Sequence, residues 1–171
     1  MTTVGPTLLT PRLRMRPLRA SDAERLHEHW NDPGIRRNLF DDEPVIAAMV
    51  VALTQRSDLD FAMRGYGFWT LVPRSSRNGG ELLGVCGLRW SRDGIRMISS
   101  VEEGHRGEGL ALEACRAVLD YAFGTLGLDR VVAAADENAE SSIQLCERLG
   151  MVRTGTVDHL AHFEARPVPP E

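Results

Sequence analysis

The feature that most constrains this chain is a short turn with two glycines, residues 106–111 (Arg-Gly-Glu-Gly-Leu-Ala), between a strand-like run and a long amphipathic segment. Glycines let the backbone turn tightly and present its N–H groups, and the start of the following helix adds the positive end of its dipole. Backbone N–H groups at a helix N-terminus bind phosphate groups. We therefore expect this turn to bind a phosphate-bearing ligand.

The segments around the turn predict an α/β domain with a mixed sheet that is antiparallel in its first half. After the turn, apolar residues recur with the helical period up to residue 122 and face one side. Two capping boxes, Ser21 with Glu24 and Ser141 with Gln144, predict that helices begin there. The first of these helices is expected to stop at 31–33, and another helix is expected near 44–56. The apolar runs that predict strands are 13–18, 68–72, 82–88, 95–101 and 130–135, with weaker signals after 151.

The composition narrows the class of protein. The length of 171 residues fits one domain, 1–171, with tails at 1–11 and 166–171. The net charge of −4 argues against a nucleic-acid partner. Three cysteines without close spacing favour reduced thiols in a cytoplasmic protein over disulfides or a metal site. No apolar run approaches the ~20 residues of a membrane span, so we expect no membrane partner.

Three kinds of phosphate-binding turn compete for residues 106–111. All 20 basic residues are arginine, so the lysine of a Walker loop is absent. A dinucleotide-binding fingerprint needs a third glycine where Leu112 stands, and Asp129 comes before the next strand instead of after it. The pattern Arg106-x-x-Gly109-x-Ala111 instead resembles the pyrophosphate loop of the Gcn5-related N-acetyltransferases, the GNAT family.

This resemblance extends along nearly the whole chain. It is similar to the branch that acetylates the N-termini of ribosomal proteins, and the matching segments come in the expected order. These segments are Thr10–Leu18 with Ser21–Ala23, Trp30–Pro33, Leu83–Gly84 with Gly87–Leu88, Glu113–Cys115 with Ala122–Phe123, and Ser142–Ile143 with Cys146–Met151. The resemblance implies the GNAT fold, a mixed and mostly antiparallel central sheet with splayed middle strands and about four flanking helices.

The resemblance also implies a reaction and a site. The expected activity is transfer of an acetyl group from acetyl-CoA to a primary amine, on a protein N-terminus or a small molecule, by direct attack and without a metal. Ser142 is expected to protonate the departing thiolate, although Ser141 is an alternative because Asn138 stands one residue farther away than in relatives. The residues expected to bind CoA are Ser99, Ser100, Val101, Arg106, Gly107, Glu108, Gly109, Leu110, Ala111 and Asn138. Relatives often dimerise, so the resemblance allows a homodimer.

Some residues depart from the family's pattern. Arg96 stands near the position where many relatives have a glutamate that takes the proton from the amine, so the general base is unassigned. Glu108 places a carboxylate in the loop, and the segment after Met151 looks short for the last hairpin. His27 and His29 diverge on a helix and are expected at the surface. These departures keep an alternative open, a catalytically weak or inactive domain that binds CoA as a sensor or interaction module.

Overall fold

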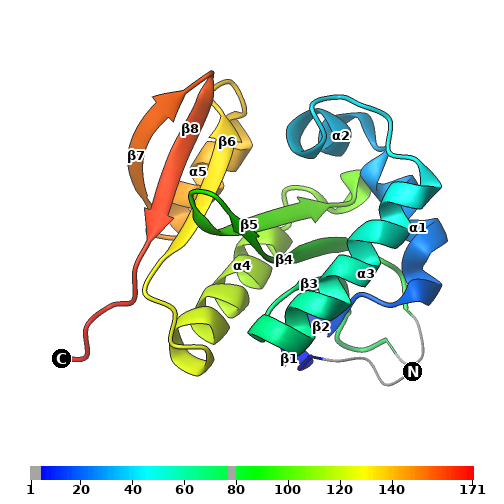
Figure 1. Cartoon of the computed structure of the whole chain (residues 1–171), viewed down its shortest axis with the longest axis horizontal. Coiled ribbons are helices and arrows are strands. Elements are labelled where there is room, and N and C mark those ends of the chain that lie inside the picture. Colours follow the sequence, from blue (N-terminus) through cyan, green and yellow to red (C-terminus); the bar gives the residue numbers. More distant parts are fainter. Residues whose placement is uncertain (1–4, 77–79) are drawn as a thin grey trace.

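The computed structural model describes residues 5–76 and 80–171, so part of the polar turn expected at 74–80 lies outside the described residues. A single sheet runs through the described residues in the order β1-β2-β3-β4-β5-β6-β8-β7 (Figure 1). Its strands are β1 (Leu8–Leu9), β2 (Leu13–Pro17), β3 (Phe68–Pro73), β4 (Gly84–Ser91), β5 (Gly94–Val101), β6 (Val131–Asp136), β7 (Val152–Val157) and β8 (Leu160–Ala165). The N-terminal tail is shorter than expected because Leu8 and Leu9 pair with β2.

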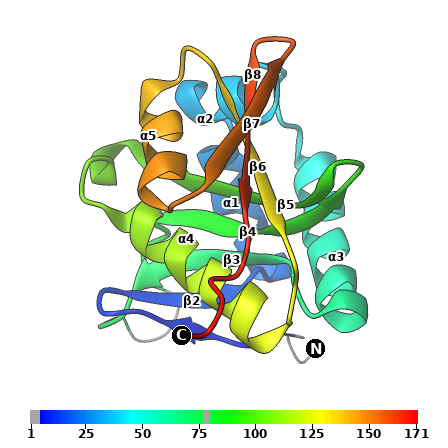
Figure 2. The same cartoon turned by 90° about the vertical axis from the view of Figure 1, so that its left-hand side faces the viewer.

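Helices cover both faces of the sheet (Figure 2). Within the described residues there are five α-helices where about four were expected: α1 (Ala23–Trp30), α2 (Pro33–Leu39), α3 (Ala47–Arg64), α4 (Leu110–Asp120) and α5 (Glu140–Arg148). The first three helices share a buried cluster with one face of the sheet, through side chains such as Leu26, Ile35 and Val50. The helices α4 and α5 bury Ala114 and Cys146 in a second cluster, on the other face.

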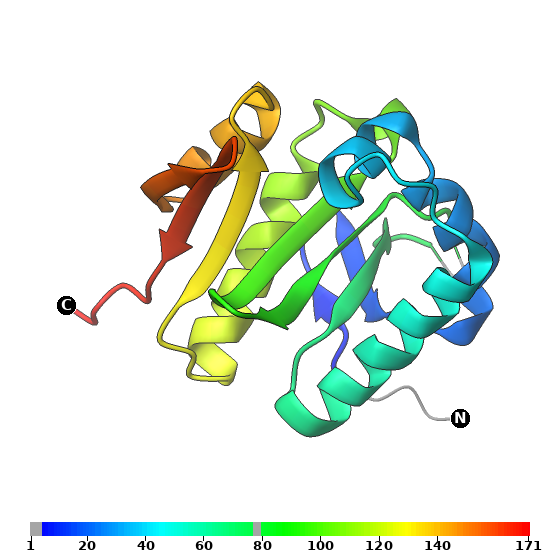
Figure 3. The same ribbon diagram turned by 45° about the horizontal axis from the view of Figure 1, so that its top comes forward.

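The sheet consists of two parts that meet at β5 and β6. From β1 to β5 every neighbouring pair is antiparallel, as predicted for the first half. The strands β5 and β6 are parallel, and in the described part of the chain a single residue pair, Arg96 with Val132, joins them. Figure 3 shows the two strands diverging from that region. The splayed middle strands expected from the family resemblance are therefore confirmed.

Both predicted capping boxes are wrong. Ser21 lies inside a 3-10 turn, and the cap there is the carboxylate of Asp22, which accepts a hydrogen bond of 2.8 Å from the amide of Arg19. The helix α5 already begins at Glu140, so Ser141 lies within its first turn. Residues that accept at an N-cap do so only when the helix begins directly after them. Here α1 begins one residue too late for Ser21 to be its N-cap, and α5 begins two residues too early for Ser141.

An additional short helix follows α1 at once. The helix α1 ends as predicted at 31–33, but the same residues start α2. The carboxylate of Asp32 accepts hydrogen bonds of 3.0 and 3.1 Å from the amides of Gly34 and Ile35. Pro33 occupies the first helical position, where its missing N–H costs nothing. The Asp-Pro pair therefore ends one helix and begins the next.

The C-terminal hairpin, which the sequence left in doubt, is present. The strands β7 and β8 pair antiparallel, and β8 pairs in turn with β6. Asp158 and His159 connect them, with φ angles of 49° and 65°. Positive φ at both central residues is the requirement of a two-residue hairpin turn. The hairpin was hard to foresee because neither residue is glycine.

Candidate functional site

The glycine turn has free backbone N–H groups at the start of α4. Gly107 and Gly109 have φ angles of 82° and 80°, a conformation that favours glycine. The amides of His105 and Arg106 donate to carbonyl oxygens within the turn. Among the described residues, no protein acceptor bonds the amides from 107 to 111. Free N–H groups before an 11-residue helix form an anion-binding site.

The side chain of Arg106 forms hydrogen bonds to other parts of the protein. Its Nη2 donates to Oδ1 of Asp32 at 2.8 Å, and its Nε donates to the carbonyl of Val101 at 3.1 Å. Burial alone would raise the pKa of Asp32, but hydrogen bonds from Arg106 and from the amide of Ile35 hold that pKa below its ordinary value. Arg106 therefore joins the end of β5 and the glycine turn to the N-cap of α2.

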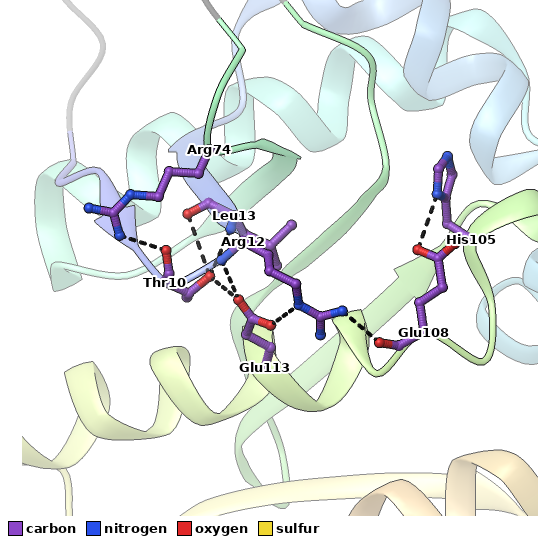
Figure 4. Close-up of polar contacts among 7 residues, drawn as sticks. All are labelled: Thr10, Arg12, Leu13, Arg74, His105, Glu108 and Glu113. Carbon is purple, nitrogen blue, oxygen red and sulfur yellow. Dashed lines mark hydrogen bonds and ion pairs between the residues drawn. The ribbon is translucent and has the colours of Figure 1, made fainter.

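The carboxylate of Glu108 turns toward His105 (Figure 4). Its Oε2 lies 3.3 Å from Nδ1 of His105, and the side chain is about half exposed. The backbone carbonyl of Glu108 accepts a hydrogen bond of 2.8 Å from Nη1 of Arg12. The guanidinium of Arg12 thus ties the backbone of the turn to the start of β2, while the carboxylate of Glu108 faces His105.

Arg12 and Glu113 were not predicted to belong to the site. In Figure 4 the carboxylate of Glu113 accepts from the hydroxyl of Thr10 (2.5 Å), the amide of Arg12 (2.8 Å) and Nε of Arg12 (2.7 Å). Burial alone would raise the pKa of Glu113, but these donors hold the pKa below its ordinary value. The alternation of arginines in 12–16 indicates only a solvated strand face, so no sequence signal distinguishes Arg12 from Arg14.

The three β5 residues expected to bind CoA alternate between the faces of the sheet. Ser99 lies opposite Cys86, on the face covered by α4, and Ser100 lies opposite Val85, on the face covered by α1. Val101 is half-buried and ends the strand. Because β5 meets β6 only at Arg96, the backbone edge from 97 to 101 has no recorded strand partner on that side among the described residues.

His29 is buried, so its predicted surface position is wrong. Only 1% of the residue is exposed. Its Nε2 lies 2.8 Å from Oγ of Ser100, and its Nδ1 lies 3.4 Å from Oε2 of Glu102. Burial lowers the pKa of His29, an effect that the carboxylate of Glu102 partly opposes. The prediction failed because helical spacing shows which residues share a face, whereas the packing of α1 against β5 decides which face is covered.

Asn138 and Ser142 follow the end of β6. The amide of Asn138 donates to Oδ1 of Asp136 at 2.8 Å, and the side chain of Asn138 is exposed. Ser142 is half-buried one helical turn before the buried Cys146, whereas Ser141 is exposed. Because β5 and β6 are parallel, the segments after their carboxyl ends lie at the same edge of the sheet. The topology therefore brings the glycine turn and the start of α5 to the same edge.

The face covered by α1, α2 and α3 contains a cavity of about 20 Å³. Its lining is largely apolar, and Arg89 is the one charged residue in it: Trp30, Leu39, Phe40, Leu53, Phe68, Arg89 and Ile98. The acidic residues 41–43 follow α2 and do not line this cavity. The carboxylate of Asp42 instead accepts a hydrogen bond from Arg36.

The side chains and helices of the described residues also bear on metal binding and membrane insertion. Across residues 5–76 and 80–171, no three His, Cys, Asp or Glu side chains gather in a group that could hold a metal ion. None of the helices in these ranges combines the length and apolar character needed to cross a membrane.

Comparison with known proteins agrees with this geometry. Residues 12–152 match the family described as acetyltransferase (GNAT) domain. The chain is 28% identical over 156 residues to the uncharacterized N-acetyltransferase p20 of Bacillus licheniformis, a match that covers 87% of this chain and 84% of p20. The resemblance to the branch of ribosomal-protein acetyltransferases stays a prediction.

Solved structures share the fold. An acetyltransferase from Agrobacterium tumefaciens superimposes with a TM-score of 0.81 at 23% identity, and the match covers 95% of each chain. The spermidine N-acetyltransferase of Vibrio cholerae, in complex with CoA and spermine, gives 0.75 at 18% identity over 92% of this chain and 96% of that one. With its splayed sheet, its glycine turn before α4 and a family match over most of its length, this chain belongs to the GNAT family of acetyltransferases.

Proposed function

We propose that this protein transfers an acetyl group from acetyl-CoA to a primary amine by direct attack. The observation that carries the proposal is the row of free N–H groups from Gly107 to Ala111 at the start of α4. These groups fit a pyrophosphate, because each phosphate oxygen accepts several hydrogen bonds and the helix dipole favours its negative charge. The guanidinium of Arg12, paired with Glu113, holds the turn in place through the carbonyl of Glu108.

The remaining site residues would hold the pantetheine arm of CoA and its thioester sulfur. The free backbone edge of Ser99, Ser100 and Val101 would pair with the amides of the pantetheine arm, and Asn138 would contact the same arm from the end of β6. Ser142 would stand at the thioester sulfur, a role that its half-buried position supports over that of the exposed Ser141.

The chemistry requires little beyond positioning. A neutral amine attacks the acetyl carbonyl, a C–N bond forms and the C–S bond breaks. A backbone N–H of β5 can stabilise the carbonyl oxygen as it gains charge. One proton leaves the nitrogen and one arrives at sulfur, and a hydroxyl such as that of Ser142 can supply the latter.

The acceptor is an amine on a small molecule or a protein N-terminus. The spermidine N-acetyltransferase of Vibrio cholerae, whose structure holds CoA and spermine, supports an amine acceptor on this fold. The cavity beside Trp30 and Ile98 lies on the face of β5 opposite α4, and its volume of about 20 Å³ is close to that needed for one water molecule.

The site is tested by titrating CoA into wild-type protein and Gly109→Trp by calorimetry. Gly109 has a φ of 80°, which a side chain strains, and a Cβ there would lie 3.5 Å from Nη2 of Arg12, so an indole would distort the turn and we expect at least a tenfold loss of affinity. The matched control is Gly127→Trp, because Gly127 also has a positive φ, 67°, and nothing lies within 4 Å of its Cβ position. Equal CoA affinity in Gly109→Trp and wild type would remove the turn from the site.

A second candidate function is CoA binding without acetyl transfer. It is favoured by Arg96, which occupies the place of the usual glutamate and whose Nη2 instead donates to Asp93 at 3.1 Å. Acetyl transfer is measured over a panel of polyamines, amino acids and peptide N-termini. Transfer to any of them supports the enzyme, whereas tight CoA binding without transfer supports the second candidate.

A further inference from the structure

Three polar side chains form a chain of contacts across the face of β5 that α1 covers. Oγ of Ser100 lies 2.8 Å from Nε2 of His29, and Nδ1 of His29 lies 3.4 Å from Oε2 of Glu102. Both His29 and Ser100 are buried, with 1% and 8% of their surfaces exposed, and the carboxylate of Glu102 is about one third exposed. A hydroxyl, an imidazole and a carboxylate in this order form a proton relay.

The relay begins next to the proposed acceptor side of the site. Ser100 belongs to the strand edge proposed to hold the pantetheine arm, and its side chain points to the face on which Ile98, two residues earlier, lines the cavity. Trp30, the residue after His29, lines the same cavity. The hydroxyl therefore lies on the side from which an amine would approach β5.

The geometry points to a proton relay in which Ser100 receives the proton of the attacking amine and passes its own to His29, which Glu102 orients. This inference rests on the proposed function and supplies the base that Arg96 cannot provide. Ser100 is the catalytic residue of the relay, and His29 and Glu102 are positioning residues that act through it.

The step balances without a further reactant. As the C–N bond forms, the nitrogen loses a proton to Oγ of Ser100, and the hydroxyl proton moves to Nε2 of His29. The imidazolium is stabilised by the carboxylate of Glu102. The thiolate that leaves takes up one proton, and His29 returns its proton to solvent before the next turnover. No group is oxidised or reduced.

Burial keeps the imidazole of His29 neutral before reaction, against the pull of the nearby carboxylates. Two carboxylates face it, Glu102 after β5 and Asp32 after α1, and one cation, Arg106 of the glycine turn. Burial is the largest influence and lowers the pKa of His29, so the ring is neutral at pH 7 and can accept a proton. Among the described residues Nδ1 of His29 has no hydrogen-bond partner. The carboxylate of Glu102, with Oε2 at 3.4 Å, can accept a hydrogen bond from it after a small shift.

The first experiment measures kcat/KM for wild type and His29→Gln from pH 5.5 to 9 with an amine from the panel. We expect the variant to lose on the order of 10²- to 10⁴-fold at pH 8, the usual contribution of a general base. The ratio of the two values cancels the titration of the amine and should decrease as the pH falls toward the pKa of His29, which burial holds below its ordinary value. The matched control is His27→Gln on the same helix, for which no change is expected.

Two measurements separate a relay from a merely structural histidine. CoA titration should give His29→Gln the wild-type affinity, and the double variant with Ser100→Ala should lose no more activity than either single variant, because both belong to one relay. In wild-type protein labelled with ¹⁵N-histidine, NMR should show the proton on Nδ1. A proton on Nε2 would make His29 a donor to Ser100 and overturn the relay.

The possible failures are distinct. An active wild type whose His29→Gln variant keeps both its rate and its pH profile would overturn the relay alone. A wild type that binds CoA but acetylates no amine would overturn the proposed function, and the proton-transfer role with it.

Discussion

Replacement of Glu113 by glutamine tests how the glycine turn is supported. The carboxylate of Glu113 accepts hydrogen bonds from the hydroxyl of Thr10 and from both the amide and Nε of Arg12. A charged acceptor roughly doubles the strength of a hydrogen bond, and the amide group of glutamine would place a donor against Nε of Arg12. The ion pair with the guanidinium contributes little to this free energy, because half of the Arg12 side chain is exposed to solvent. The expected loss is about 2 kcal/mol.

The assay is urea denaturation followed by circular dichroism at pH 7 and at pH 3. A loss of about 2 kcal/mol corresponds to roughly 4–8 °C in melting temperature for a chain of this size. The folded-state pKa of Glu113 lies below the unfolded value of 4.5, so its charge stabilises the fold above that value. The stabilisation is lost as the pH falls through the folded-state pKa, and the difference between wild type and Glu113→Gln should then close.

The control is Glu140→Gln, which also lies in the first turn of a helix but has only Gln144 as a partner in the described residues. Glu140→Gln removes a negative charge from the same place relative to a helix dipole as Glu113→Gln does, so the two variants share that effect. Wild-type stability of Glu113→Gln at pH 7 would refute the reasoning. A stability difference that persists unchanged at pH 3 would refute it equally, because packing and not charge would then be the cause.

Two other predictions concern the serine and the thiols. Ser142→Ala should lower kcat at least tenfold with CoA affinity unchanged, measured by transfer assays and calorimetry; an unchanged kcat would exclude thiolate protonation by this residue. Burial raises the pKa of Cys146 to about 11, and the hydrogen bond with Cys115, together with burial, raises that of Cys86; all three thiols are buried. Ellman's reagent should therefore label none of the three cysteines in native buffer and all of them in denaturant, whereas rapid native labelling would show an accessible thiol.

Much of the fold could be predicted because local patterns determine it. The strands β3, β4 and β5 and the helix α4 lie within a few residues of their predicted positions, since short apolar runs indicate buried strands and a period of 3.6 residues indicates a helix with one buried face. Helix ends were less predictable. A capping serine such as Ser141 is recognised by its spacing to a later residue, but the actual start of α5 after Ala139 depends on how the chain leaves β6.

The candidate site was predictable only where backbone chemistry dominates. The two glycines of the turn indicate its backbone conformation, because few other residues adopt a φ near 80°. His29 and Arg12 could not be assigned in the same way. Their partners, Ser100 and Glu113, lie 71 and 101 residues away along the chain. Contacts at such separations depend on the assembled sheet and leave no trace in local spacing.

The single bridge between β5 and β6 gives this sheet an internal edge. Exposed sheet edges invite other chains to add a strand, which leads to aggregation. This edge does not lie at the rim of the sheet, because β6, β8 and β7 follow beyond it and helices cover both faces (Figure 2). The sheet thus keeps unpaired backbone groups in its interior without presenting them as an open edge to other chains.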